Sequence, residues 1–456
     1  MSDDVVEPTQ ASPENRISRR RLLQGAGALA AAGAAVPILG GPASATTAAK
    51  SFGSYASRRS IKKTQLTLMS WEPFEPPEIA AWRQVTNTFQ QKNPSIQVTW
   101  TGWPFANYDA NVIAQAEAGN IAADVVMCPP ELGSTLIQLY DLAVPIGDIA
   151  TSLGLVPNPA HEQFRLNGKL YLLGILEVAF LLAYDRKILE KGGFSGPPES
   201  AGAWLEMTKK LTHGNQYGTL LINDAAAAAD SWNTLQNFPL GFGGVWASGR
   251  NLTIDSKENV AAIQFYVDLV KASGLAGTVE AVLTKLWYNS QIATNFTVGF
   301  GAASLKSIAP QLYPTLASGP APWAGHKAIA RLHGNVVLKT SNHLDASLEL
   351  CKWMIEPSNL WYVTQKNGYP VIPYSNFGSI IKGYNAFQAK SPWIGGFSKT
   401  NYVGEANILG DYVFAYAEIG NLIGTNVVKA ISGSATVTEA LQAAQQQAKS
   451  SIHLPK

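Results

Sequence analysis

The chain has 456 residues, of which 46% are hydrophobic and 14% charged, and its formal net charge is +2. A chain of this length and composition buries a large core in two or three domains and is not disordered. No basic stripe suggests nucleic acid and no acidic surplus suggests a polycation, so we expect an uncharged ligand.

The beginning of the chain has the features of an export signal. A twin arginine within Ser18–Gln24 precedes an uncharged run rich in Ala, Gly and Leu, and the small residues of Ala43–Ala45 form a cleavage pattern. We therefore expect a twin-arginine signal peptide at residues 1–45 and a flexible leader at residues 46–63, with an uncleaved membrane anchor as the alternative. The first cysteine is Cys128, too late to carry a lipid at the cleavage point, so a lipoprotein is not expected.

From residue 64 the apolar pattern alternates between strand and helix. Strands are expected over Gln65–Ser70, Ile96–Trp100 and Asp124–Met127. Helices are expected after them, over Ile79 to Lys92, over Asn111 to Glu117, and where Leu132, Leu136 and Leu139 share one face. Strands separated by helical crossovers predict an α/β fold, with a mostly parallel sheet flanked by helices.

Aromatic and acidic residues follow each of these strands. Trp71 and Glu72 come after the first strand, Trp103 after the second and Glu131 after the third. Ligands bind beyond the carboxyl ends of the strands in such sheets, so these four are candidate ligand-binding residues. Capping of the core is the alternative role for the two tryptophans.

A second α/β unit is expected to begin near Val178. The run Ala179–Tyr184 is strand-like, a helix carrying Trp204 and Leu211 follows it, and Tyr217–Ile222 is strand-like again. The chain therefore repeats the α/β pattern in its second part, without an internal sequence repeat.

Six short segments give the chain a resemblance to a known family. They are Phe89–Val98, Ala118–Val126, Asn167–Tyr171, Ala183–Leu189 with Trp204, Phe265–Gly274, and Ile431–Leu441. In content and order they resemble segments of the extracellular solute-binding proteins of ABC importers, the sugar-binding group that includes maltose-binding protein. Within the segment Ala118–Val126, one position departs from the family pattern, because Ala123 stands where the family has proline. The resemblance covers nearly all of residues 64–450.

The resemblance implies a two-lobe periplasmic-binding-protein fold with a hinge. Lobe one would comprise residues 64–172 and 335–368, and lobe two residues 175–332 and 370–456. A carbohydrate or related polyol would bind between the lobes, which close by hinge bending. The closed form would deliver its ligand to an ABC permease, and the protein would act as a monomer in the periplasm or on the outer face of the cell membrane.

The resemblance also implies ligand-binding positions. Glu177 would supply a carboxylate after the first crossover, Trp232 a stacking aromatic, and Phe300 stands where the family commonly has tryptophan. His333 and Asn335 fall at the second crossover and depart from the family pattern. With Trp71, Glu72, Trp103 and Glu131 they complete the predicted site. Aromatic rings would cover the apolar faces of a sugar, and carboxylates and amides would bind its hydroxyls.

No motif for bond-making chemistry accompanies the 12 Trp, 16 Tyr and 16 Phe. The six histidines form no metal-ligand pair, so neither a metal nor a cofactor is expected.

Cys128 and Cys351 are expected to be separate buried thiols, with a single disulfide as the alternative. Two other functions stay open: an exported carbohydrate-active hydrolase or lyase, and an adhesion or sensor module with the same fold.

Overall fold

The computed structural model describes residues 63–71, 79–223, 228–298, 302–367, 372–390 and 395–454. The predicted signal peptide, residues 46–62 of the leader, and the site candidates Glu72 and Phe300 lie outside the described residues. Within the described ranges, no helix combines the length and apolar character that crossing a membrane requires.

The first part of the chain forms three parallel strands with β1 in the middle, in the order β2-β1-β3. They are β1 (Thr64–Met69), β2 (Ile96–Thr101) and β3 (Val125–Cys128), which confirms the three predicted strands. The connecting elements are α2 (Ile79–Lys92), α3 (Phe105–Glu117), α4 (Pro130–Ser134), η2 (Thr135–Leu139), α5 (Gly147–Ser152), η3 (Pro159–Phe164), β4 (Arg165–Leu166) and β5 (Lys169–Leu170).

The predicted helix through Leu132, Leu136 and Leu139 differs in one respect. It begins as α4 but continues as η2, a π-helical segment. Leu132 and Leu136 are buried as expected, whereas Leu139 is 42% exposed. The wider i→i+5 turn of a π-helix rotates the later residue away from the face that an α-helix would give it.

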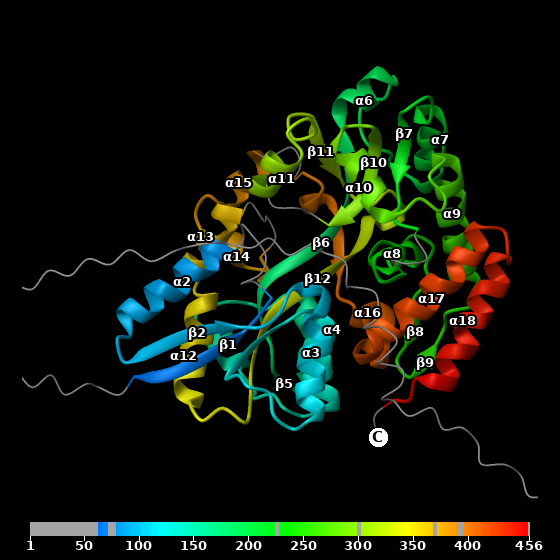
Figure 1. Cartoon of the computed structure of the whole chain (residues 1–456). Helices are drawn as coiled ribbons and strands as arrows, with labels where there is room; N and C mark the ends of the chain where they lie inside the picture. Colours follow the sequence, from blue (N-terminus) through cyan, green and yellow to red (C-terminus); the bar gives the residue numbers. More distant parts are fainter. Residues whose placement is uncertain are drawn as a thin grey trace, which may run out of the picture. The chain divides into compact units, whose positions relative to one another are not determined.

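Two long strands run through the centre of the molecule (Figure 1). β6 (Leu173–Asp185) and β12 (Lys327–Val337) pair antiparallel, and together they extend the sheet from β3 to β10 and β7. The path is β2-β1-β3-β12-β6-β10-β7, with β11 paired to β6 and β13 paired to β12. Both crossovers are therefore continuous strands, each shared by the two ends of the sheet.

The remaining elements follow the predicted α/β pattern. Between the long strands lie α6 (Arg186–Lys191), α7 (Ala201–Leu211), β7 (Tyr217–Leu220), α8 (Ala228–Leu235), η5 (Phe238–Gly241), β8 (Ala247–Ser248), β9 (Asn251–Leu252), α9 (Lys257–Ser273), α10 (Glu280–Tyr288), β10 (Ile292–Val298), α11 (Ala302–Ile308), β11 (Leu316–Gly319) and η6 (Ala324–His326). After β12 come α12 (Leu344–Ile355), α13 (Pro357–Asn367), α14 (Phe377–Ile380), α15 (Tyr384–Lys390), η8 (Phe397–Lys399), β13 (Asn401–Val403), α16 (Ala406–Leu409), η9 (Gly410–Ala415), α17 (Tyr416–Ile431) and α18 (Val437–Ser451).

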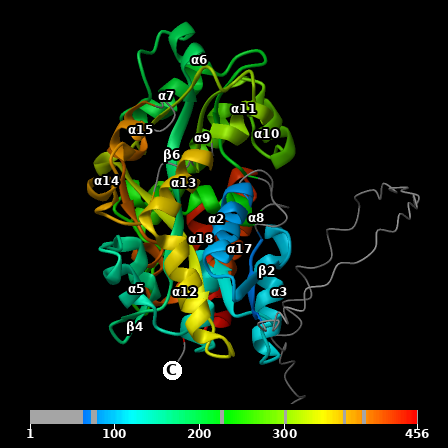
Figure 2. The same ribbon diagram turned by 90° about the vertical axis from the view of Figure 1, so that its left-hand side faces the viewer.

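Local sequence signals fix the ends of the longer helices. Ser256 caps α9 by accepting a hydrogen bond from the amide of Asn259, and Gly274 ends it in a left-handed conformation. Thr436 and Glu439 form a reciprocal capping box at the start of α18. α17 and α18 then pack side by side, as both views show (Figures 1 and 2).

Two large hydrophobic clusters lie along the long strands. The first core takes Leu173 and Ile175 from β6 and Leu332 and Val336 from β12. The second core takes Phe180 and Leu182 from β6 and Ala328 and Ile329 from β12. The first core includes β1 to β3 with α12, and it also contains Ile372, Tyr374, Phe377 and Tyr384. α9, α17 and α18 belong to the second core. Each long strand therefore changes core along its length.

The two cysteines are free and fully buried, which confirms the prediction of separate thiols. Cys128 ends β3 and Cys351 lies in α12. Burial raises the pKa of both thiols above the ordinary value, that of Cys351 to about 12.

A close approach of backbone at the carboxyl ends of β1 and β2 requires glycine. Gly102 has a φ of +143°, and a Cβ there would lie 1.9 Å from the carbonyl oxygen of Ser70. We expect Gly102→Ala to lower the free energy of unfolding by about 2 kcal/mol or more, because both the clash and the backbone strain oppose it. Thermal melting checks this against Gly202→Ala, which meets nothing within 4 Å. Equal melting temperatures for the two variants would contradict it.

Candidate functional site

A single arginine on β12 gathers acidic, amide and aromatic groups around it. Nη2 of Arg331 donates to both carboxylate oxygens of Glu131, at 2.7 and 2.6 Å, and Nη1 donates to Oδ1 of Asn233 at 2.9 Å. Nε lies 2.8 Å from Oε1 of Glu405, and Cζ lies 4.9 Å from the ring centroid of Tyr416. We call these five residues the Arg331 cluster.

The Arg331 cluster joins elements of the two cores. Glu131 lies in the first turn of α4, directly after β3, and α4 begins with Pro130. Asn233 lies on α8, Glu405 immediately precedes α16, and Tyr416 begins α17 and belongs to the second core. The guanidinium therefore ties the carboxyl end of a first-core strand to helices of the second core.

The cluster is almost entirely removed from solvent. The side chains of Arg331, Glu131 and Glu405 are 8%, 16% and 0% exposed. Burial raises the pKa of Glu405, although the charge of Arg331 opposes that rise. The neighbouring Asp109 on α3 behaves alike, because burial and the charge of Glu131 raise its pKa while Arg331 lowers it. Burying an ionised carboxylate is costly, so burial shifts both acids toward their neutral forms while the charge of Arg331 opposes that shift.

Buried polar atoms without a hydrogen bond concentrate here. Of the 14 such side-chain atoms in the described part of the chain, seven belong to this cluster or its immediate neighbours, and two of these seven, Nε of Arg331 and Oε1 of Glu405, face each other as an ion pair at 2.8 Å. They are Oδ1 of Asp109, Nε1 of Trp232, Oε1 of Gln236, Nε of Arg331, Nδ1 of His333, and Oε1 and Oε2 of Glu405. Buried polar groups are nearly always paired, so this concentration is typical of a site where a ligand supplies the partners.

Two predicted residues lie beside the cluster. The rings of Trp71 and His333 meet edge to face with their centroids 5.4 Å apart, and Trp71 also packs against Tyr108. The Tyr108 hydroxyl lies 3.0 and 2.8 Å from the carbonyl oxygens of Met69 and Met127, which fixes the ends of β1 and β3. Burial and the charge of Arg331 lower the pKa of His333 to about 3, so its imidazole is neutral.

Three other predicted residues are packed in the interior. Trp232 is 1% exposed and its ring lies 5.9 Å from that of Tyr416. Asn335 is fully buried and donates from Nδ2 to the sulfur of Met354 at 3.3 Å. Trp103 is partly buried and packs against the first core. Of the three, Trp232 contacts the Arg331 cluster directly.

Glu177 lies away from the cluster, on the other side of the long strands. It is paired in register with Leu332, and side chains alternate along a strand, so Glu177 faces away from Arg331 and His333. Both its oxygens accept from Nδ2 of Asn158, at 2.9 and 3.0 Å. Burial raises the pKa of Glu177 to about 7, although the hydrogen bonds from Asn158 lower it.

The sequence prediction missed Asn233, Arg331, Glu405 and Tyr416. One signal could have revealed Arg331, because it is the single charge within the apolar run Ala328–Leu332. An arginine inside a buried strand needs acidic partners. Across the described residues, no three acidic, histidine or cysteine side chains are arranged to hold a metal ion.

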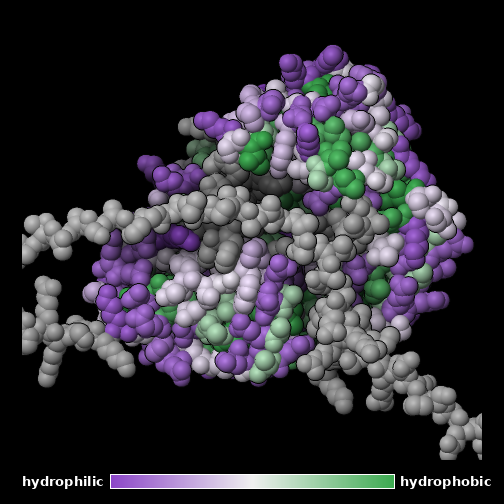
Figure 3. Space-filling model, in the orientation of Figure 1, coloured by the Kyte–Doolittle hydropathy of each residue, from purple (hydrophilic) through white to green (hydrophobic). Residues whose placement is uncertain are grey.

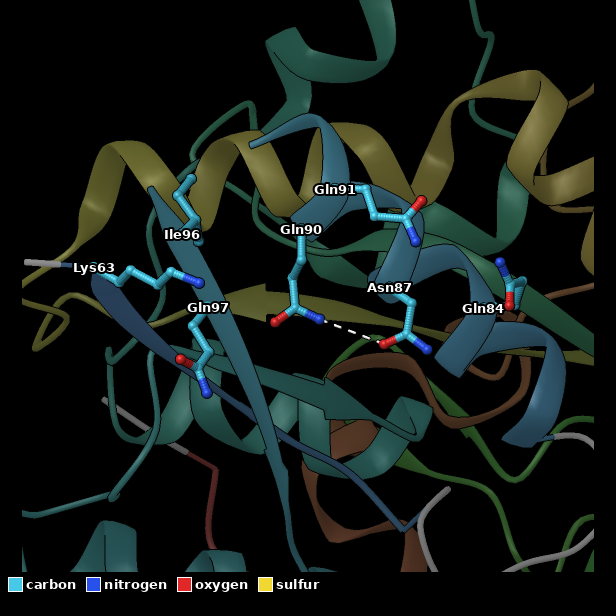
Figure 4. Close-up of a pocket in the computed structure, with 7 residues that line it drawn as sticks. All are labelled: Lys63, Gln84, Asn87, Gln90, Gln91, Ile96 and Gln97. Atoms are coloured by element: carbon cyan, nitrogen blue, oxygen red, sulfur yellow. Dashed lines mark hydrogen bonds between the residues drawn. The ribbon is translucent and has the colours of Figure 1, made fainter. Parts of the chain in front are cut away.

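A separate hollow of about 490 Å³ opens on the surface between α2 and β2 (Figure 4). It is lined by Lys63, Gln84, Asn87, Gln90, Gln91, Ile96 and Gln97. Gln90 donates to Asn87 across it at 3.4 Å, and the surrounding surface is hydrophilic (Figure 3). None of the predicted site residues lines this hollow.

Removing the guanidinium should destabilise the protein in a pH-dependent way. We expect Arg331→Met to cost about 3–5 kcal/mol at alkaline pH, because buried carboxylates are left unpaired. The cost should shrink as the pH falls, since the remaining carboxyl groups then take up protons. Melting temperatures across the pH range check this, with the exposed Arg83→Met as the control. A cost that does not vary with pH would contradict the assignment.

Glu177 should make stability fall as the pH rises. Its folded pKa of about 7 exceeds the ordinary value of 4.5, so the folded state holds a proton that the unfolded state has lost. As the pH rises from 4.5 to about 7, the free energy of unfolding of the wild type should fall by about 3 kcal/mol, and that of Glu177→Gln should not. Denaturant unfolding at a series of pH values measures the two slopes. Glu162→Gln, an exposed carboxylate, is the control and should follow the wild type.

Comparisons with known proteins agree with this architecture. Residues 75–360 match the profile of the family described as bacterial extracellular solute-binding protein. UgpB from Mycobacterium tuberculosis, in complex with glycerophosphocholine, has a TM-score of 0.70 at 16% identity, covering 85% of this chain and 98% of its own. A solute-binding protein from Thermotoga lettingae, bound with α-D-tagatose, has a TM-score of 0.69 at 17% identity over 85% and 99%.

A third structure, an ABC transporter solute-binding protein from Agrobacterium vitis S4 with bound D-mannitol, has a TM-score of 0.68 at 18% identity, covering 86% of this chain and all of its own. The structural likeness confirms the predicted two-lobe α/β fold. The profile match covers well over half of the chain. The protein is therefore a member of the bacterial extracellular solute-binding protein family.

Proposed function

We propose that the protein captures a carbohydrate or related polyol at the Arg331 cluster and delivers it to an ABC permease. The observation that carries this proposal is the concentration of unpartnered buried polar atoms where elements of the two cores meet. Carboxylate, amide and imidazole groups there suit the hydroxyls of a sugar, and Trp71 would supply an aromatic ring for its C–H groups. The ligands of the structural neighbours, tagatose and mannitol, support this class.

Two cores joined by continuous strands support a hinge-closing mechanism. We propose that the two cores belong to two lobes, and that Arg331 and Glu131 hold the lobes together when the site is closed. Opening would separate Glu131 from Arg331 and admit the ligand, whose hydroxyls would then share these groups. Glu72, Trp103, Phe300 and Asn335 remain proposed contributors from the sequence, and Glu177 would act on the opposite side of the hinge strands.

Membership of the family weighs against an exported hydrolase or lyase. Solute-binding proteins are non-enzymatic components of transport, and they deliver their ligands unchanged. The family is extracellular, which agrees with export; the twin-arginine route, cleavage near residue 45 and the absence of a lipid anchor are part of the proposal. An adhesion or sensor module would bind ligand in the same way but would have no permease.

A thermal-shift screen of the mature chain, residues 46–456, tests the proposed ligand class. The panel contains monosaccharides, disaccharides, oligosaccharides and polyols. A ligand at about 100 times its dissociation constant adds about 2.7 kcal/mol and should raise the melting temperature by a few degrees. Recovery of the ligand unchanged would support transport over catalysis. No shift with any compound would count against a carbohydrate or polyol ligand.

Variants locate the site for any compound that the screen finds. Asn233→Ala should weaken its binding about tenfold or more, because a partly buried hydrogen-bonding group is lost next to Arg331. Gln90→Ala, in the surface hollow, should leave the affinity unchanged and serves as the control. Isothermal titration calorimetry measures both. If Gln90→Ala lost binding and Asn233→Ala kept it, the ligand would bind in the hollow and not at the Arg331 cluster.

A further inference from the structure

The acidic groups around Arg331 exceed the charge that it can balance. Glu131 uses both oxygens on Nη2 of Arg331, at 2.7 and 2.6 Å, which makes a neutral pair. Glu405 and Asp109 remain. Among the described residues, Arg331 is the cation whose charge lowers the pKa of these two acids and so favours their ionised forms. His333 lies beside Arg331 but is neutral, so it adds no positive charge.

Glu405 is the more informative of the two acids. It is 0% exposed, and its partner among the described residues is Arg331, whose Nε lies 2.8 Å from Oε1. Oε2 has no hydrogen-bond partner in the part of the chain that the structure describes. A fully buried carboxylate with one unpaired oxygen lacks part of the donors that its burial calls for.

The other unpartnered atoms also call mostly for donors. Oδ1 of Asp109 and Oε1 of Gln236 are acceptors, and the amide nitrogen of Gln236 is already used by the hydroxyl of Tyr416 at 2.7 Å. The unpartnered donor is Nε1 of Trp232, because Nε of Arg331 faces Glu405, and Nδ1 of the neutral His333 ring can donate or accept. A ligand that completes this site must therefore donate more hydrogen bonds than it accepts.

We propose that the ligand of this site carries a positive charge: a sugar or polyol with an ammonium group, which pairs with Glu405 while Asp109 adds to the negative potential. Its hydroxyls would donate to the remaining acceptors, Oδ1 of Asp109 and Oε1 of Gln236. This inference rests on the proposed function, because it specifies the ligand of the same site. If the ligand were a neutral polyol, the excess negative charge of Glu405 and Asp109 could be neutralised only by protonation of these acids.

The charge of the ligand should change how many protons the acids of the site hold. Without ligand, burial favours the neutral forms of Glu405 and Asp109. An ammonium group favours the ionised forms, so binding should release protons and tighten as the pH rises. A neutral sugar would show neither effect.

Matched ligand pairs test the proposal on the mature chain. D-glucose is compared with D-glucosamine, and D-sorbitol with N-methyl-D-glucamine, by titration calorimetry in two buffers of different ionisation enthalpy. We expect the amine to bind about tenfold or more tightly than its neutral partner in at least one pair, with proton release. Glu405→Gln should reduce that preference to about twofold. Glu206→Gln, an exposed acid on α7, should leave it unchanged.

A second variant guards against a folding defect. If Glu405→Gln does not fold, Asp109→Asn should reduce the same preference by a measurable factor. Equal affinities within every pair, or tighter binding of the neutral members, would overturn the inference and leave the proposed function standing. Binding of neither member of any pair would overturn the inference and count against a carbohydrate or polyol ligand as well.

Discussion

The pairing of β6 with β12 is the constraint on which the rest of the structure depends. These two strands are the shared part of the sheet, and each contributes side chains first to one core and then to the other. Elements far apart in the sequence meet because they pack on the same strand pair. Glu131 and Arg331 are 200 residues apart and form the shortest contact of the cluster, at 2.6 Å.

The alternation of side chains along these strands also separates two buried acidic sites. Arg331 and His333 project to one side, and Glu177 with Asn158 lies on the other. On the side of Arg331, several acids surround this cation. On the other side, the acid is Glu177, and its hydrogen bonds come from the side-chain amide of Asn158. Burial raises the pKa of the acids on both sides, but the group that opposes the rise differs: it is the charge of Arg331 for Glu405 and the hydrogen bonds from Asn158 for Glu177.

Most of the fold could be predicted from the sequence, because apolar periodicity is a local signal. The helix from Ile79 to Lys92 and the strands around Leu68, Val98 and Val126 lie where the pattern places them. The start of α3 at Phe105 was missed, because the apolar pattern around Asn111 is clear only in its second half. The resemblance to solute-binding proteins came from short segments in order, and residues 75–360 confirm it.

The site was harder to predict, because its residues come from distant segments. Glu131 and Trp71 could be proposed from their place after strands, whereas nothing near Glu405 or Asn233 in the sequence marks them. The expectation of an uncharged ligand came from the net charge of +2, which is a sum over the whole chain. Such a sum does not say where the charges lie, so it cannot reveal a local group of acids such as the one around Arg331.

The state of the two cysteines has a practical consequence. Both thiols are buried without forming a disulfide, and burial keeps them protonated and therefore unreactive. A cysteine introduced on the surface would thus be the reactive one under native conditions. Fluorophores could be attached at chosen points on the two sides of the long strands without removing a native thiol, and a change in the distance between them on addition of ligand would show whether the protein moves.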